Sequence, residues 1–400
     1  MSSVNTTKRG LQAEAVLALV GLLLVAINLR PALTSVSPVL KNIAAGLSLS
    51  PAAQGVLTTL PVVCLGLAAP LAPKMSRRIG PERTVFAFLI LLAITLLARP
   101  LTGMVGLFVF TALAGACIGI MNVLLPGIVK RDFPTRVGLI TGLYTVALNL
   151  GASLAAGATE PLRQAFGDQW QPSLVFWLVP AVIAALVWIP QLRVAHTARV
   201  RPREGHSLYR NALAWQVTLF MGLQSSLAYT VFGWLPTILQ DRGVAPVTAG
   251  LALSVSILFQ VVTAITTPLL GGRMKDQRAV LVGVVLLTLL GLAGCLYAPT
   301  QSLWLWIVIL GLGQGGSFSM ALTLLALRAP DGDTAAELSG MAQGVGYVLA
   351  AFGPLLVGLL HDWAGGWDVV GILLGLIGLG AMIVALGAGR NLLVRPHEAT

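Results

Sequence analysis

Long apolar segments recur along the whole chain and limit what it can fold into. Twelve of them are separated by short polar segments. They lie near 13–40, 52–72, 84–98, 103–126, 138–160, 171–190, 214–240, 247–271, 279–297, 302–327, 335–360 and 367–389. A helix of about 20 mainly apolar residues crosses the hydrocarbon core of a bilayer. We therefore predict an all-α membrane protein with twelve transmembrane helices.

The composition excludes soluble classes of protein. Charged residues make up 10% of the 400 residues, whereas a soluble globular chain carries roughly 25%. The net charge of +11 would suggest nucleic acid as a partner in a soluble chain. Here the basic residues lie in short loops between apolar segments, without interleaved aromatic residues. We therefore expect the lipid bilayer as a partner and no nucleic acid.

Lysine and arginine residues predict the orientation in the membrane. With the N-terminus in the cytoplasm, 20 of the 25 basic residues fall in cytoplasmic segments and four in segments on the other side. Positive residues are retained on the cytoplasmic side of an inner membrane. Both termini are therefore predicted to be cytoplasmic. The remaining basic residue, Arg30, belongs to neither side.

Matching landmarks divide the chain into two similar halves. Residues 50–55 resemble residues 245–250, and Pro38 matches Pro236 at an offset of 198. Six helices in each copy give both copies the same orientation. Such parallel repeats are typical of transporters that hold their substrate between the halves. The predicted domains are an N-terminal six-helix bundle, 1–190, a cytoplasmic linker, 191–213, and a C-terminal six-helix bundle, 214–400.

Arg30 is the one ionisable residue that the sequence places deep in the membrane, roughly 20 Å along the first helix. An arginine at this depth costs at least about 2.5–3.5 kcal/mol, so it needs a wet cavity or a partner. No carboxylate is expected at the same depth, and a planar guanidinium suits a small anion or a planar polar acceptor. Arg30 thus binds substrate or, alternatively, bonds helix-end carbonyls and holds the first helix to a neighbour. Pro31 removes the amide partner of the Ile27 carbonyl and favours a kink at this point.

Further polar and aromatic residues lie in the middle of apolar segments, where an unpaired polar group is costly. For each of them, a hydrogen bond between helices is as good an explanation as contact with substrate. Tyr229 and Trp234 are the best candidates for aromatic walls of a binding site. The predicted substrate-binding residues, besides Arg30, are Asn28, Asn122, Tyr144, Asn149, Gln224, Tyr229, Trp234, Gln260, Gln314, Gln343 and Tyr347.

The loop after the second apolar segment resembles the signature loop of the major facilitator superfamily. Arg77 and Arg78 match its arginine pair, and Lys74 replaces a third arginine. Pro73 stands where the family has an aspartate, so the gating interaction of that aspartate is not expected here. The resemblance assigns Lys74, Arg77 and Arg78 to a conformational or gating loop.

Longer runs resemble one subgroup, the cyanate permease and 2-nitroimidazole exporter family. They start at Asn28, Asn122, Leu213 and Leu338, and the likeness spans nearly the whole chain. It implies a bacterial inner-membrane secondary transporter with alternating access, whose first, fourth, fifth, seventh, eighth, tenth and eleventh helices line a central cavity. The implied substrate is a small anion or polar planar solute such as cyanate. The alternative is export of nitroimidazole-like or other small drug compounds.

Other functions are less consistent with the sequence. Gly311–Gly316 matches the dinucleotide fingerprint but lies inside an apolar segment, without the strand that this fingerprint requires, and indicates helix packing. The sequence lacks a nucleotide-binding loop, a metal cluster and a nucleophile–base set, so we expect no cofactor, no metal and no enzymatic activity. A membrane-embedded enzyme and a channel remain the less favoured alternatives. We expect a monomer, with Glu14 and Glu160 as weak candidates for proton coupling.

Overall fold

The computed structural model describes residues 16–193, 208–330 and 332–394, which form helices joined by short turns. The predicted linker, 191–213, falls largely outside these residues. The first half contains a helix at 16–28, α2 (Pro31–Thr34), η1 (Ser37–Val39), α3 (Leu40–Leu47), α4 (Pro51–Ala68), α5 (Leu71–Ile79), α6 (Pro81–Ala98), α7 (Gly103–Asp132), α8 (Val137–Ala165), α9 (Trp170–Val175), α10 (Leu178–Trp188) and η2 (Ile189–Arg193). The second half contains η3 (Leu208–Arg210), α11 (Ala212–Asp241), α12 (Pro246–Arg273), α13 (Arg278–Tyr297), η4 (Thr300–Ser302), α14 (Leu303–Leu327), α15 (Gly332–Ala364) and α16 (Asp368–Ala388).

The helices confirm the predicted fold class. Within the described residues, 11 helical segments are long and apolar enough to cross a membrane. The helix α11 also has 30 residues, long enough to span a bilayer, but its glutamine, serine and threonine residues make it more polar than the others. Its polar side chains are buried in the protein, so they do not have to face lipid. Counting α11, the chain has the twelve predicted membrane-spanning segments.

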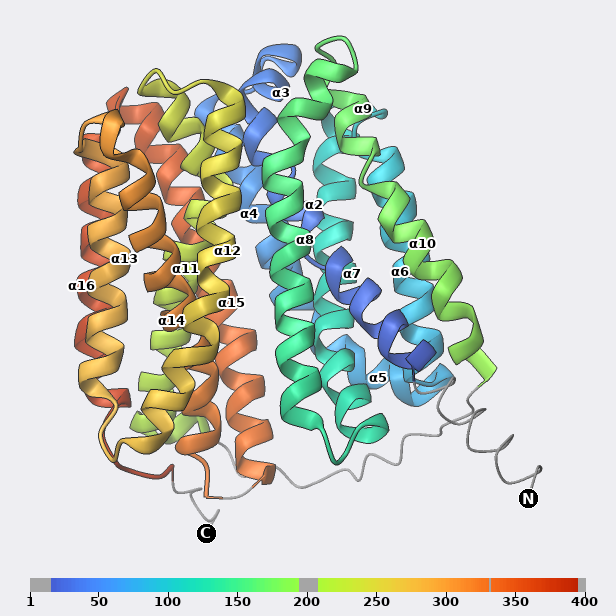
Figure 1. Cartoon of the computed structure of the whole chain (residues 1–400), viewed down its shortest axis with the longest axis vertical. Coiled ribbons are helices and arrows are strands. Elements are labelled where there is room, and N and C mark those ends of the chain that lie inside the picture. Colours follow the sequence, from blue (N-terminus) through green and yellow to red (C-terminus); the bar gives the residue numbers. More distant parts are fainter. Residues whose placement is uncertain (1–15, 194–207, 331, 395–400) are drawn as a thin grey trace.

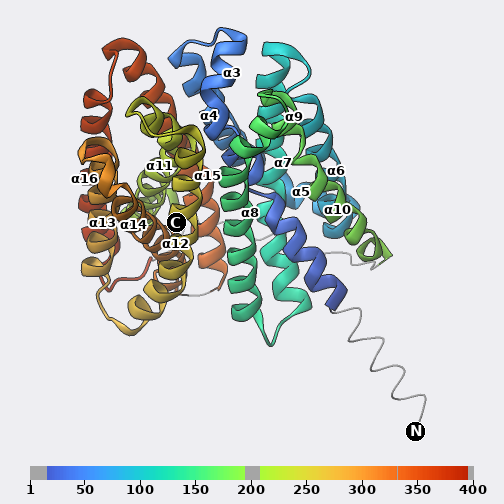
Figure 2. The ribbon, with the colours of Figure 1, turned by 45° about the horizontal axis from the view of Figure 1, so that its top comes forward.

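The two halves lie side by side with their long helices roughly parallel (Figures 1 and 2). They pack against each other mainly through α4 with α15 and α8 with α12. We call the end of the molecule that carries η2 and η3 the linker end, and the opposite end, which carries α3 and α9, the distal end (Figure 1). These two names are used below without reference to a side of the membrane.

Contacts between the halves are tightest towards the distal end. The backbones of α4 and α15 cross where a Cβ atom on Gly55 would lie 3.0 Å from the Cα atom of Gly358. Ser153 on α8 hydrogen-bonds Ser254 on α12, with 2.8 Å between the hydroxyl oxygens. Towards the linker end α8 and α12 diverge (Figure 1). The halves are therefore closed against each other distally and spread apart at the linker end.

The glycine-rich segment of α14 lies where α12 and α13 approach it. A Cβ atom on Gly311 would overlap the main chain at Ser256, and one on Gly315 would overlap the main chain at Gln260. The segment is helical throughout. Its glycines therefore allow close helix packing, as the sequence indicated, and do not form a nucleotide-binding turn.

Candidate functional site

The first transmembrane segment is broken at Arg30. Residues 16–28 form a helix, residues 29–30 form a turn, and the helical conformation resumes as α2 at Pro31. The break lies against α8, because the carbonyl of Ile27 approaches Gly151 so closely that a Cβ atom there would overlap it. Pro31 offers no amide hydrogen to this carbonyl. The kink expected at Pro31 is confirmed, and it directs Arg30 between the two halves.

The guanidinium of Arg30 has an aromatic neighbour from the other half of the chain. Its central carbon lies 5.4 Å from the centroid of the Phe232 ring on α11, in cation–π geometry. The side chain is partly exposed. Among the described residues, no carboxylate, side-chain acceptor or main-chain oxygen bonds this guanidinium. Its hydrogen-bond donors are therefore free to meet a ligand.

Three tyrosines surround this charge. The hydroxyl groups of Tyr144 on α8, Tyr229 on α11 and Tyr347 on α15 are close enough to Arg30 to interact with its charge. The rings of Tyr229 and Tyr347 meet edge to face with 6.1 Å between centroids. The Tyr144 hydroxyl donates to Asn122 Oδ1 on α7 at 3.2 Å. Four of the predicted site residues thus gather around Arg30.

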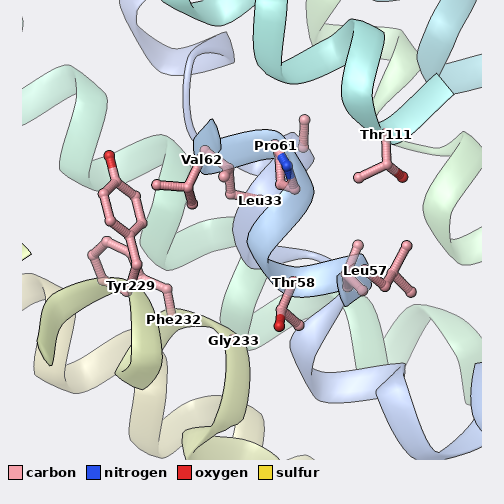
Figure 3. Close-up of a pocket in the computed structure, with 11 residues that line it drawn as sticks. Leu33, Leu57, Thr58, Pro61, Val62, Thr111, Tyr229, Phe232 and Gly233 are labelled. Carbon is pink, nitrogen blue, oxygen red and sulfur yellow. The ribbon is translucent and has the colours of Figure 1, made fainter. Parts of the chain in front are cut away.

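A narrow cavity lies between the halves next to this cluster (Figure 3). Tyr229, Phe232 and Gly233 of α11 face residues of α2, α4 and α7 across it, including Thr58 and Thr111. The cavity has space for about one water molecule. In this conformation the side chains of the two halves therefore leave little free space beside the cluster.

Two predicted residues are held away from Arg30 by hydrogen bonds. The amide of Asn28 donates to Pro180 O at 3.0 Å and attaches the first helix to α10. The indole of Trp234 donates to Pro354 O at 3.1 Å and packs near His361 and Trp367 at the distal end. The structure therefore does not bring Trp234 into an aromatic wall with Tyr229.

Four of the five remaining predicted residues form hydrogen bonds within their own half. Gln260 on α12 donates to Gln314 on α14 at 3.2 Å. Gln224 donates to Ser225 at 2.7 Å within its own helix. Gln343 likewise donates to Ser339 at 2.8 Å, and Asn149 is buried on α8. These contacts favour helix packing for this group of residues.

Two residues beside the broken helix were not predicted from the sequence. Phe232 lies three residues after Tyr229 and therefore on the same face of α11, a spacing that identifies it in retrospect. Arg99 is one of the four basic residues counted on the side opposite the termini, but its side chain is fully buried and donates to Ala32 O at 2.8 Å. Burial lowers the pKa of Arg99 to about 10. A fully buried cation therefore lies near the partly exposed Arg30, because the long Arg99 side chain reaches back into its half.

The predicted gating residues lie on the surface. Lys74, Arg77 and Arg78 are exposed on α5 at the linker end, and no ion pair within the described residues involves them. At the same end, Arg131 on α7 forms an ion pair of 2.5 Å with the buried Glu82 at the start of α6. This pair joins two helices of one half.

The two carboxylates considered for proton coupling have different outcomes. Glu160 is fully buried on α8 and pairs with Arg163 at 2.9 Å. Glu14 lies outside the described residues.

Known proteins resemble this chain along most of its length. The family model of the Major Facilitator Superfamily matches residues 22–351 and 218–398 of the chain. An uncharacterised transporter of Bacillus subtilis, YycB, is 41% identical over 93% of both chains. The 2-nitroimidazole transporter of Escherichia coli is 38% identical over 95% of this chain and 97% of its own, and the cyanate transport protein CynX of Escherichia coli is 31% identical over 91% and 95%.

Solved structures share the fold at much lower sequence identity. The nucleoside transporter NupG superposes with a TM-score of 0.78 at 12% identity, covering 93% of this chain and 99% of its own. A D-xylose–proton symporter superposes with a TM-score of 0.72 at 14% identity, covering 95% and 97%. The helical scaffold and the sequence matches along most of the chain agree, and the chain belongs to the major facilitator superfamily of small-solute transporters.

Proposed function

We propose that the chain is a secondary transporter that carries a small anion or polar planar solute, such as cyanate, by alternating access. The observation that carries this proposal is the unpaired guanidinium of Arg30, partly exposed between the two halves. A buried or half-buried cation without a protein partner is costly. A ligand that accepts hydrogen bonds there removes this cost when it binds.

The groups around Arg30 are complementary to an acceptor-rich, flat solute. Arginine presents five donors in a plane and matches carboxylate-like or nitro-like oxygen pairs. The rings of Phe232, Tyr229 and Tyr347 offer flat apolar contacts beside these donors. A small anion uses the donors and neutralises the charge, which favours closure of the halves around it.

Export of nitroimidazole-like or other small drug compounds is the second proposed function. A neutral nitro-ring would place its oxygens on Arg30 and its ring against Phe232 or Tyr229. The 2-nitroimidazole transporter of Escherichia coli is similar over nearly the whole chain, which supports this alternative.

Alternating access is supported by the uneven contact between the halves. Tight distal packing at Gly55 and Gly358, with divergence of α8 and α12 at the linker end, is the geometry of a carrier open to one side. We propose that the bundles 1–190 and 214–400 move as two bodies within a monomer. Exposed Arg77 and Arg78 at the linker end support a cytoplasmic position for this end and for both termini in a bacterial inner membrane.

Ligand-induced stabilisation of the purified protein tests the binding site. A panel of small anions and nitro-heterocycles is screened by thermal unfolding, because a ligand that binds only the folded state raises Tm. We expect a stabilising ligand to lose its effect in Arg30→Ala and to keep it in Arg210→Ala, a control at an exposed arginine of η3. An undiminished shift in Arg30→Ala would show that substrate binds elsewhere. Uptake and efflux by proteoliposomes containing the same ligand then separate the two proposed directions.

A further inference from the structure

A carboxylate at the distal end joins the two halves. Asp241, the last residue of α11, pairs with Lys41 of α3 at 2.5 Å between Oδ1 and Nζ. Among the ion pairs of the described residues, this one connects the first half to the second. Its other oxygen, Oδ2, accepts from the indole of Trp367 at 3.0 Å and lies 3.8 Å from His361 Nε2.

The pair lies where the halves must separate for the distal side to open. The neighbouring Gln240 donates to Pro38 O in the first half at 3.2 Å. The crossing of Gly55 and Gly358 belongs to the same closed end. Movement of one half away from the other at this end therefore requires that the contact between Lys41 and Asp241 be broken.

His361 is placed to control this contact. It belongs to the same half as Asp241, and its ring lies 4.3 Å from that of Trp367 and 6.4 Å from that of Trp234. Its side chain is 22% exposed, so protons can reach it, and its Nδ1 is buried without a partner among the described residues. The charged groups that act on it are Asp241, Asp362 and Lys41. The nearby Arg242 is bound to main-chain oxygens of Cys295 and Ala298.

The effect of a proton on His361 follows from this geometry. Histidine changes its charge between about pH 5 and 8. With neutral His361, the single negative charge of Asp241 is bound by Lys41 across the interface. With protonated His361, a second cation attracts Asp241 within its own half and repels Lys41 of the other half. The attraction between the halves weakens, and the tryptophan faces stabilise the new cation.

We propose that His361 is a proton-binding site that releases a distal gate formed by Lys41 and Asp241. The gate rests on the alternating-access function proposed above, and under the proposed orientation the proton arrives from outside the cell. Acidification on that side shifts the transporter towards the state that opens distally, without a ligand at Arg30.

Distance measurements between the halves test the gate separately from substrate binding. Spin labels are placed at Ser48→Cys and Gln301→Cys, both at exposed distal positions, in a Cys64→Ala background in lipid nanodiscs. We expect the population of molecules with a long distance between the two labels to rise at least threefold from pH 7.5 to pH 5.5. No ligand is added, so a failure of the proposed binding site leaves this readout intact.

Four variants decide the role of each group. His361→Gln should remove the pH response and keep the short distances, whereas His361→Arg, permanently charged, should show long distances at both pH values. Lys41→Gln should do the same as His361→Arg, and Lys130→Gln, an exposed lysine at the linker end, should behave as wild type. A pH response that persists in His361→Gln overturns the assignment of the proton site. Short distances in both Lys41→Gln and His361→Arg overturn the gate.

Discussion

The first membrane segment and its repeat counterpart, α11, differ in continuity and in charge. The first segment is interrupted at Arg30, whereas α11 runs for 30 residues without interruption despite Pro236. The offset of 198 between Pro38 and Pro236 places Ala228 opposite Arg30. The scaffold is duplicated, but the cation is present in one copy only.

This difference indicates a division of work between the halves. The first half contributes the charge and polar groups, Arg30, Asn122 and Tyr144. The second half contributes mainly ring faces, with Phe232 and Tyr229 on α11 next to the cation. The second copy has alanine at the matching position, so the cation of the site comes from the first half. A binding site with its cation from one half and its aromatic rings from the other therefore arises when two copies of one scaffold diverge in sequence.

Removal of the charge is expected to have the largest effect on binding. Arg30→Gln deletes charge-assisted hydrogen bonds worth about 1.5–3 kcal/mol, which corresponds to a loss of affinity of roughly 10- to 150-fold. The counterpart change, Ala228→Gln on the partly exposed face of α11, should leave affinity within about threefold of wild type. Titration calorimetry with the stabilising ligand measures both. Equal losses in the two variants would contradict the division between the halves.

The break in the first segment should depend on Gly151. Gly151→Ala adds a Cβ atom that overlaps the carbonyl oxygen of Ile27, and such overpacking costs about 1–3 kcal/mol. Gly380→Ala is the matched control, because its Cβ atom would meet only Leu223 of α11, at 3.6 Å. Thermal unfolding in detergent should show a lower Tm for the first variant and an unchanged Tm for the second. An unchanged Tm in both would show that the first helix can shift without cost.

The ring from α11 should matter only while Arg30 is present. Phe232→Leu removes a cation–π contact worth about 0.5–2 kcal/mol, so affinity for an anion should fall by roughly two- to 30-fold. In an Arg30→Gln background the same change should have little effect, which a double-mutant cycle measures directly. Additive losses would mean that Phe232 contacts the ligand independently of Arg30.

The sequence allowed prediction of the scaffold and of the centre of the site. Segment length and apolarity determine how many helices span a bilayer, and α11 was found despite its polar residues. Arg30 and the kink at Pro31 were identifiable because a mid-membrane charge and an internal proline have few explanations. These features depend on local sequence, so no knowledge of packing is required.

Which neighbours surround Arg30 depends on how helices are rotated against each other. Tyr229 and Phe232 are about 60° apart around a helix, whereas Tyr229 and Trp234 are about 140° apart. The two aromatic residues proposed from sequence therefore point in different directions, and Trp234 reaches Pro354 instead. Arg99 shows a second limit, because the position of a backbone in sequence does not tell where a long side chain ends.

The smallest expected effect on affinity comes from two of the three tyrosines near Arg30, one from each half. Tyr144→Phe removes the donor to Asn122 Oδ1, a hydrogen bond worth about 0.5–1.5 kcal/mol. The ring is then no longer fixed to α7 beside the charge, so affinity should fall by roughly two- to tenfold. Tyr347→Phe keeps the ring that packs on Tyr229 and should change affinity by less than about twofold. A competition assay, in which each variant and the wild-type protein compete for the same stabilising ligand, resolves differences of this size. If Tyr347→Phe shows the larger loss, the second half supplies a polar contact to the ligand, and the halves share the polar chemistry of the site.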